Sequence, residues 1–286
     1  MARQAAVPID LVVKFGGSAI TDKCQMETLK EDNLASAADV IRKCVERGVR
    51  CVVIHGAGSF GHHHAKEYQV NAGLRGTIEE VKRRRHGVCL TRLSVTKLNH
   101  MVVRSLVDKG INAIGLPAAG SWLMDNGQVS RHGVTSIVEL LDSCFVPVLH
   151  GDCVLDSSKG CIILSGDVII KTICKEQKVN RVVFLSDVFG VYDKPPSQTD
   201  AEHISKICVS QDRRIMTDIS TSESQYDVTG GMMLKIQTAM DIVINSGGTT
   251  KVYITKVGSN CVNQICEGLD TGQDDTKSFT QIIHHQ

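Results

Sequence analysis

Two glycine-rich stretches carry side chains that could bind phosphate. In each, the glycines come after a short apolar run. The stretch 55–62 reads HGAGSFGH and follows the run 50–54, while the stretch 11–18 reads LVVKFGGS and places Lys14 before a glycine pair. Backbone N–H groups gather at such strand-to-helix turns and bind anions, and the Lys14 ammonium or the His62 imidazole adds a further donor. The two stretches therefore predict phosphate chemistry. The P-loop pattern G-x-x-x-x-G-K-[ST] does not occur, and we expect no dinucleotide site.

The elements around these stretches predict how they are positioned. The segment 30–47 has apolar residues every three or four positions and is expected to be a helix that ends before Gly48. It connects two strand-like runs, and a β-α-β unit of this kind brings both glycine stretches to one edge of a parallel sheet. Asp167 precedes an expected helix at 168–174. Its carboxylate either caps that helix or orients lysines around a polyphosphate.

The rest of the chain is expected to continue this alternation. The segment 78–109 predicts a long helix, with the basic run 82–86 on a solvated face. Its apolar stripe belongs to the core and would also form the pocket for any hydrocarbon tail of a substrate. We expect 197–226 to be an irregular excursion, and the polar tail after Gly268 indicates little. Further strands are expected at 113–116, 145–149, 181–185 and 251–254, a hairpin-like piece before Leu164, and helices at 134–141, at 236–244 and from about Ala65.

Composition limits the class of protein. The 286 residues, 42% of them hydrophobic, are enough for one large or two moderate domains with a sizeable core. A formal charge of +1 argues against a nucleic-acid or acidic-membrane binder. We find no signal-peptide pattern or membrane-spanning run and expect a cytoplasmic protein. Eleven cysteines without a C-x-x-C pair predict reduced, small core residues.

Four loops in this order resemble the amino acid kinase superfamily: strand–GG, strand–GAGSFGH, SGD–helix, and TGGM–helix with Lys235 four residues after the second glycine. Within it, the stretches 14–18 (KFGGS), 21–23 (TDK) and 150–152 (HGD), together with His62, are similar to the isopentenyl phosphate kinases. The stretches 145–152 and 188–196 look like the eukaryotic forms, and the similarity extends from about residue 11 to 268. Ala57 stands where many relatives have glycine, which requires a negative φ at that position.

The resemblance implies an α/β fold, a three-layer αβα sandwich around an open, mostly parallel sheet, as in carbamate kinase. An N-terminal lobe, residues 1–178, would bind the acceptor, and a C-terminal lobe, residues 179–286, would bind ATP within one continuous sandwich; a homodimer is also implied. The matched residues are, for catalysis, Lys14, Lys23, His62 and Asp167; for the acceptor, Ala57, Gly58, His62 and Gly166; and for ATP, Lys14, Gly16, Gly17, Ser18, Gly58, Asp187, Tyr192, Asp193, Gly230, Gly231 and Lys235.

The implied activity is the ATP-dependent phosphorylation of isopentenyl phosphate to isopentenyl diphosphate, a step of isoprenoid biosynthesis on an alternative mevalonate route. An alkyl monophosphate has a second pKa near 6, so it is already a nucleophile at neutral pH and no general base is required. Lys14, Lys23, the glycine amides and a Mg²⁺ ion bridging the β- and γ-phosphates would stabilise the moving charge. His62 would clamp the acceptor phosphate. We expect Lys14→Ala to leave the fold intact.

Several alternatives stay open. The acceptor could be a carboxylate, carbamate, nucleotide or phosphonate, or the chain could be a nucleotide-binding regulator without turnover. His62 could merely cap the helix that follows it. His63 and His64 could ligate a metal, but adjacent helical residues point in different directions, which favours solvent exposure. Asp152 could cap a turn or act directly in the site.

Overall fold

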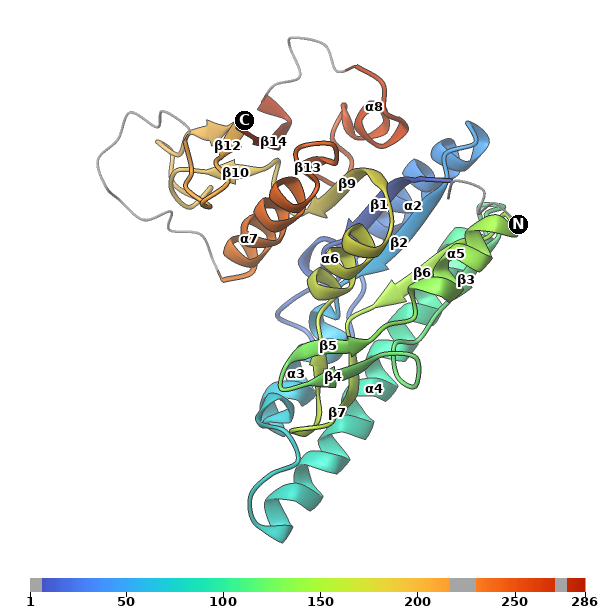
Figure 1. The fold of residues 1–286 in the computed structure, drawn as a ribbon, viewed down its shortest axis with the longest axis vertical. Helices are drawn as coiled ribbons and strands as arrows, with labels where there is room; N and C mark the ends of the chain where they lie inside the picture. The colour runs from blue at the N-terminus through green and yellow to red at the C-terminus, as the bar shows by residue number, and fades with distance from the viewer. Residues whose placement is uncertain (1–6, 217–229, 271–276, 286) are drawn as a thin grey trace.

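The computed structural model describes residues 7–216, 230–270 and 277–285 of the chain. Eight strands form its main sheet, in the order β12-β14-β13-β9-β1-β2-β6-β3 (Figure 1). All neighbours are parallel except β13 and β14. The strands are β1 (Ile9–Phe15), β2 (Cys51–His55), β3 (Ala113–Gly115), β6 (Val146–His150), β9 (Val179–Ser186), β12 (Lys206–Val209), β13 (Lys251–Lys256) and β14 (Phe279–His284).

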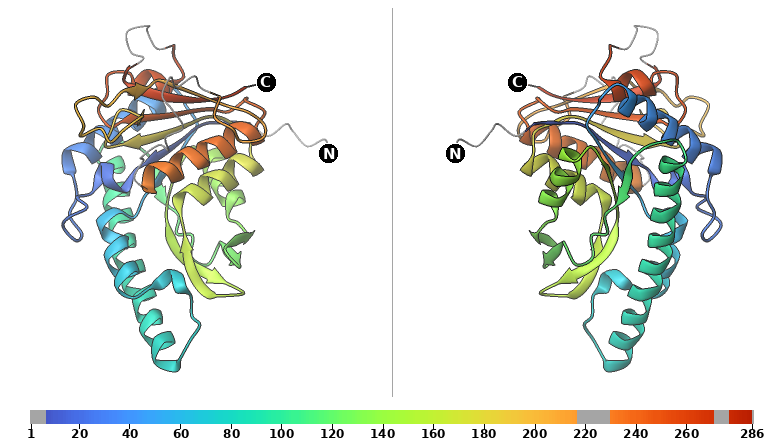
Figure 2. Two further views of the ribbon diagram at one scale, coloured as in Figure 1. Left: turned by 90° about the vertical axis from the view of Figure 1, so that its left-hand side faces the viewer. Right: turned by 90° about the vertical axis from the view of Figure 1, so that its right-hand side faces the viewer.

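Helices cover both faces of this sheet (Figure 2). One face packs against α5 (Val134–Asp142), α6 (Gly166–Glu176) and α7 (Gly230–Asn245), and the other against α1 (Gly17–Ile20), α2 (Glu31–Glu46), α4 (Ile78–Val107) and α8 (Val262–Glu267). Side chains alternate along each central strand, so that Val12 joins the first core and Val13 the second, and both are fully buried. A strand covered on both faces reads as a continuous apolar run. The expected three-layer αβα sandwich is confirmed.

A smaller four-stranded sheet lies beside α3 (Gly58–Glu67) and the first half of α4, and together they extend away from the main sheet (Figure 1). Its strands, in the order β5-β4-β7-β8, are β4 (Leu123–Asp125), β5 (Gln128–Arg131), β7 (Asp152–Asp156) and β8 (Gly160–Leu164). Thr77 starts α4 with a capping box, because its hydroxyl accepts from the Glu80 N–H and Glu80 accepts from the Thr77 N–H. The 30-residue helix therefore connects the extension to the main sheet.

Most predicted elements are present, but two predictions are wrong. The helix expected from Ala65 begins at Gly58, within the glycine stretch, because glycine tolerates the φ of +51° that its first residue adopts. The excursion after Ser197 contains β11 (His203–Ile204), which pairs with β10 (Val191–Tyr192), and the sheet strand β12. The polar tail after Gly268, for which no element was predicted, contains β14, and α8 ends just before it. Residues 217–226 of the excursion lie outside the described residues.

Surface features agree in part with the sequence analysis. The basic run 82–86 lies mostly on an exposed face of α4, where Arg84 pairs with Glu80 at 3.5 Å. Six cysteines are buried, but Cys24, Cys89 and Cys144 are exposed, so the expectation of core cysteines is wrong for these three. Within the described ranges, no helix is long and apolar enough to cross a membrane.

Candidate active site

The loops after β1 and β2 touch each other at the carboxyl edge of the sheet. The Gly56 N–H donates to the Phe15 carbonyl at 2.9 Å, and a Cβ added to Gly17 would lie 2.6 Å from the Gly58 nitrogen. The Thr21 hydroxyl donates to the Gly17 carbonyl at 2.7 Å and accepts from the Ser59 N–H at 3.0 Å. Glycine is therefore required here by backbone packing, before any ligand is considered.

Gly56, Gly58 and Gly61 have the spacing G-x-G-x-x-G, so spacing alone gives no ground for setting a dinucleotide aside, as the sequence analysis did. The structure shows what these glycines do. A Cβ on Gly56 would lie 2.7 Å from the Gly17 nitrogen, and one on Gly61 would lie 2.5 Å from the Ala57 Cβ. Ala57 itself has a φ of −71°, which satisfies the condition for alanine at this position.

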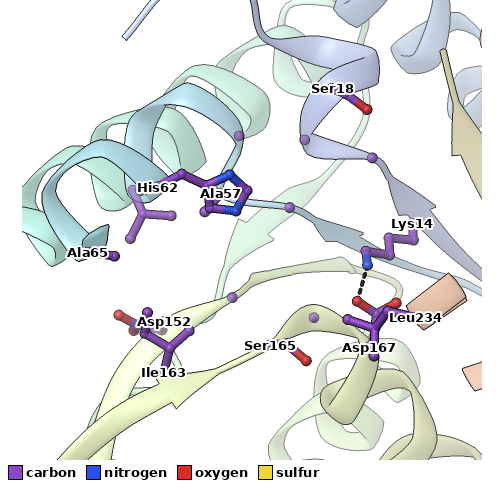
Figure 3. A pocket seen from close by; sticks show the side chains of 18 of the residues that line it. Lys14, Ser18, Ala57, His62, Ala65, Asp152, Ile163, Ser165, Asp167 and Leu234 are labelled. Atoms are coloured by element: carbon purple, nitrogen blue, oxygen red, sulfur yellow. Dashed lines mark hydrogen bonds and ion pairs between the residues drawn. The ribbon is translucent and has the colours of Figure 1, made fainter. Parts of the chain in front are cut away.

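A cavity of about 240 Å³ opens between these loops and the start of α6. It brings together most of the residues that the sequence singled out, from β1, α1, α3, α6 and α7 (Figure 3). The predicted residues in its lining are Lys14, Gly16, Gly17, Ser18, Lys23, Ala57, Gly58, His62, Gly166, Asp167 and Lys235. Segments more than 200 positions apart in sequence thus meet at one sheet edge.

Lys14 and Asp167 form an ion pair at the floor of the cavity. The Lys14 Nζ lies 2.5 Å from the Asp167 Oδ2, and each side chain is only 8% exposed. The first turn of α6 is capped by Ser165, whose hydroxyl accepts from the Val168 N–H, so Asp167 is free of the capping role. Its second oxygen, Oδ1, is buried and has no hydrogen-bond partner within the described ranges. Asp167 is therefore positioned to hold Lys14 and accept a further donor.

Two more ammonium groups add positive charge to the cavity. Burial lowers the pKa of Lys235 on α7, and the Lys14 charge lowers it further, whereas the carboxylates of Asp187 and Asp167 oppose this shift. Lys23 lies on the exposed loop between α1 and α2 and contributes to the same field. Burial would raise the pKa of Asp187, but its own N–H and the Lys23 charge more than compensate, so the carboxylate is ionised. Such a cluster favours a polyanionic ligand.

His62 lies in α3, and its ring points toward the centre of the cavity (Figure 3). Although the residue is exposed as a whole, partial burial lowers the pKa of the imidazole, and the nearby His63 and Lys23 lower it further. Because it belongs to the second turn of α3, His62 does not cap this helix. His63 is exposed, as expected, but His64 is half-buried. No cluster of three metal-ligating side chains occurs among the residues that the structure describes.

The far end of the cavity is mostly apolar. Thr91 and Val95 of α4, with Ala65, Cys153 and Ile163, form this wall, in agreement with the pocket expected beside the long helix. Thr91 and Val95 are four residues apart and therefore lie on one face of α4. The cavity thus joins a cationic end to an apolar end. That combination suits a short alkyl chain carrying a phosphate.

Asp152 lines the cavity but is engaged by its neighbours. It is 1% exposed and accepts from the Arg92 Nε at 2.8 Å, from the Ala119 N–H at 3.2 Å and from the Cys153 N–H at 2.8 Å. These contacts favour a structural role. Sequence reasoning missed Arg92, since an arginine in a helix rich in basic residues gives no signal of a partner 60 positions away.

The remaining residues matched to ATP binding lie outside this lining, which is drawn from the described part of the chain. Asp187 follows β9, and the Tyr192 ring packs edge-on against the His203 ring, with centroids 5.2 Å apart. The Asp193 carboxylate accepts from the Glu202 N–H at 2.7 Å. Gly230 and Gly231 form the start of α7, the helix that carries Lys235.

Comparison with known proteins shows to which family the chain belongs. The model of the amino acid kinase family matches residues 11–256. The chain belongs to the amino acid kinase family. An isopentenyl phosphate kinase of Arabidopsis thaliana is 35% identical, over 88% of each chain. An isopentenyl phosphate kinase of Methanothermobacter thermautotrophicus is 33% identical, over 79% of this chain and 84% of that one.

Solved structures agree with this membership. An isopentenyl phosphate kinase structure superposes on this chain with a TM-score of 0.74 and 26% identity. The superposition covers 95% of this chain and 99% of the other. A product complex of the T. acidophilum isopentenyl phosphate kinase gives a TM-score of 0.71 at 25% identity, over 96% and 99% of the two chains. A carbamate kinase of Giardia lamblia, at 14% identity and a TM-score of 0.66 over 98% and 100%, shares the fold. The expected resemblance is confirmed.

Proposed function

We propose that this member of the amino acid kinase family transfers the γ-phosphoryl group of ATP to isopentenyl phosphate and produces isopentenyl diphosphate and ADP. The observation that carries the proposal is the two-ended cavity, in which Lys14, Lys23 and His62 face an apolar wall that includes Val95 and Ile163. The relatives named as isopentenyl phosphate kinases support the same acceptor. The proposed reaction belongs to isoprenoid biosynthesis.

The acceptor phosphate would lie between α3 and α6. His62 and the N–H groups of Ala57, Gly58 and Gly166 would donate to its oxygens, and its hydrocarbon chain would extend toward Val95. The γ-phosphate of ATP would lie between Lys14, Lys23 and Lys235, beside the loop 16–18. Asp167 would hold Lys14 in place through the 2.5 Å ion pair. Asp187, Tyr192, Asp193, Gly230 and Gly231 are the proposed contacts with the rest of the nucleotide.

The reaction is a displacement at the γ-phosphorus of ATP. An oxygen of the acceptor phosphate forms a new P–O bond while the bond to the β–γ bridging oxygen breaks, and ADP leaves with that electron pair. Since the acceptor phosphate is mostly dianionic above pH 6, no residue has to remove a proton. Holding two reactants in line lowers the activation free energy by about 7–11 kcal/mol. Fixed cations stabilise the charge that spreads over the transferred phosphoryl group.

Magnesium fits this site as a partner of the nucleotide. The described residues provide no three-ligand cluster, and Mg²⁺ is commonly held by substrate phosphates, water and one or two carboxylates. The unpartnered Oδ1 of Asp167 and the ionised Asp187 are the candidate carboxylates. When bound, the ion would neutralise charge on the β- and γ-phosphates.

The proposed lobes share one sheet. Residues 1–178 supply β1, β2, β6 and β3, and residues 179–286 supply β9, β13, β14 and β12. We propose that the first set presents the acceptor site and the second the ATP site, with β1 and β9 adjacent where the two meet. The homodimer and the cytoplasmic location remain predictions.

Comparing acceptors in a coupled assay of ADP release tests the function. With ATP and Mg²⁺, isopentenyl phosphate and dimethylallyl phosphate are expected to give faster turnover than longer prenyl phosphates or small carboxylates. Faster turnover of a carboxylate would contradict the proposed acceptor. Absence of ADP release with every acceptor would indicate a nucleotide-binding protein without turnover.

Replacing His62 with alanine is expected to lower kcat/KM for isopentenyl phosphate by about 10- to 150-fold. The reason is that a hydrogen bond to a charged group contributes roughly 1.5–3 kcal/mol. His62→Asn keeps an N–H donor, so its kcat/KM for isopentenyl phosphate should fall by a smaller factor. The kcat/KM for ATP, measured in the same assay, serves as the control. Wild-type values for both variants would show that His62 does not hold the acceptor.

The pH dependence of acceptor use should also depend on His62. Burial, His63 and Lys23 lower its pKa in the free protein, and a bound phosphate dianion would raise it again. Binding would then take up a proton, so acceptor affinity falls as pH rises from the free to the bound pKa. We expect this alkaline decline in kcat/KM for the wild type and its loss in His62→Asn. An identical decline in both would assign it to another group.

Shortening Ile163 to alanine is expected to shift acceptor preference toward longer prenyl phosphates. The smaller side chain opens the apolar end of the cavity, and each additional buried CH₂ contributes about 0.8 kcal/mol. The ratio of kcat/KM values for a ten-carbon and a five-carbon acceptor measures the effect. Leu93→Ala on α4, where the side chain is exposed, is the matched control and should leave the ratio unchanged.

A further inference from the structure

Two buried histidines lie directly beneath the candidate site and take no part in the proposed chemistry. His55 ends β2 and His150 ends β6, and the two residues face each other in the strand register. Their rings stack with centroids 5.4 Å apart and an interplanar angle of 25°. His55 is 0% exposed and His150 is 1% exposed. Buried polar rings at this depth require an explanation in terms of their hydrogen bonds.

The contacts of His55 define its tautomer. Its Nδ1 lies 3.1 Å from the Gly56 carbonyl, which can only accept, so Nδ1 carries the proton. Its Nε2 lies 3.1 Å from the Asn99 Nδ2, which can only donate, so Nε2 is bare. Burial lowers the pKa of His55 to about 3, with a smaller contribution from His150, and the ring is therefore neutral at physiological pH. Both ring nitrogens are satisfied in this one state.

The same arrangement recurs at His150. Its Nδ1 lies 2.9 Å from the Gly151 carbonyl, and the Gly151 N–H in turn donates to the His55 carbonyl at 3.3 Å. Each histidine thus holds the carbonyl of the glycine that follows it. Gly56 and Gly151 both line the cavity.

Fixing a carbonyl also fixes the N–H of the next residue. A trans peptide is planar, so the Gly56 C=O and the Ala57 N–H point in opposite directions. With the carbonyl held by His55, the Ala57 N–H is directed away from the histidine pair. Within the described ranges, neither the Ala57 N–H nor the Gly58 N–H donates to another backbone group. Both are therefore available to an anion in the cavity.

Asn99 connects this arrangement to α4. Together with Thr91 and Val95 it follows a spacing of four residues, so one face of α4 provides both the apolar wall and the partner of His55. Asn99 is 8% exposed, and the polar contact would be lost if it were replaced by a hydrocarbon side chain.

We propose that Asn99, His55 and His150 are positioning residues that orient the peptide groups of the acceptor-phosphate loop. The inference rests on the proposed function, because it assumes that the Ala57 and Gly58 N–H groups bind the phosphate of the acceptor. The three side chains contact no substrate. They act by holding the Gly56 and Gly151 carbonyls.

Steady-state kinetics of three variants test the proposal. His55→Leu removes the donor to Gly56 at similar bulk, and Asn99→Leu leaves the His55 Nε2 unpaired. His55→Asn restores an N–H near the position of Nδ1. We expect His55→Leu to lower kcat/KM for isopentenyl phosphate by roughly 10- to 100-fold, because small displacements of binding groups cost about this much. Asn99→Leu should lower this kcat/KM by a smaller factor, and His55→Asn should have a kcat/KM close to that of the wild type. The KM for ATP should stay within about twofold of the wild-type value in all three variants.

A purely structural role predicts a different result. It would lower the melting temperature of His55→Leu. The ratio of kcat/KM for isopentenyl phosphate to kcat/KM for ATP would stay at its wild-type value. Equal losses in His55→Asn and His55→Leu would also overturn the proposal, since the restored donor would have no effect.

A spectroscopic readout does not depend on turnover. In ¹⁵N-histidine-labelled wild-type protein, ¹⁵N NMR at neutral pH should show His55 protonated at Nδ1 and bare at Nε2. The opposite tautomer or a charged ring would contradict the proposed positioning even if the enzyme is active. If the tautomer is as expected but wild-type protein does not turn over isopentenyl phosphate, the proposed function fails and the hydrogen-bond arrangement stands.

Discussion

Lys14→Met is expected to lower kcat by roughly 10²–10³-fold, because it removes a fixed cation from the position where phosphoryl charge develops. The Lys14 Nζ is held at 2.5 Å from the Asp167 carboxylate at the cavity floor. A wild-type kcat in a correctly folded Lys14→Met variant would remove Lys14 from the mechanism.

Stability provides the control for this variant. Both side chains are buried, so losing Lys14 leaves an uncompensated carboxylate, and we expect the variant to fold with a free energy of unfolding lower by about 3–5 kcal/mol. The double variant Lys14→Met/Asp167→Asn should recover much of this stability, measured by urea unfolding, but none of the activity. If activity returned with stability, the role of the pair would be structural.

Gly17→Ala is expected to lower kcat by about 100-fold and the free energy of unfolding by about 1–3 kcal/mol. The added Cβ would lie 2.6 Å from the nitrogen and 2.8 Å from the Cα of Gly58. Both neighbours are backbone atoms, which cannot rotate away. The two phosphate-binding loops must therefore separate, and the groups that they carry lose their alignment.

A core variant distant from the cavity separates the two effects. Ile265→Ala in α8 removes a side chain that is 2% exposed and should cost about 2–5 kcal/mol. At a temperature where both variants are folded, Ile265→Ala should retain wild-type kcat and Gly17→Ala should not. Equal kcat values in the two variants would show that the contact between Gly17 and Gly58 matters only for stability.

The sequence predicts the central sheet well because its strands are buried on both faces. The runs 11–13, 51–54 and 182–185 read as continuous apolar segments, and they lie in β1, β2 and β9. The strands β12 and β14, at the C-terminal end of the sheet, give weaker signals. β12 contains Lys206 and β14 contains Gln281, and β14 joins the sheet only by pairing with distant segments, which local patterns do not encode.

The candidate site was predictable as a set of loops but not as a set of contacts. Lys14 and Asp167 are 153 positions apart, so only the assembled sheet reveals that they form an ion pair. The pairing of Arg92 with Asp152 and the His55–His150 stack were invisible for the same reason. Residue type alone also suggested that the glycines serve the ligand, whereas Gly17, Gly56 and Gly58 are first required by the contact between two loops.

A crystal structure with isopentenyl phosphate and a non-hydrolysable ATP analogue would test the central claim most directly, which is that cations and backbone amides of one cavity hold both phosphates. The account predicts that His62 and the Ala57 N–H donate to the acceptor phosphate, and that the Lys14 Nζ lies within hydrogen-bond distance of the γ-phosphate. Phosphates bound away from Lys14 and His62, or on opposite sides of the sheet, would contradict it.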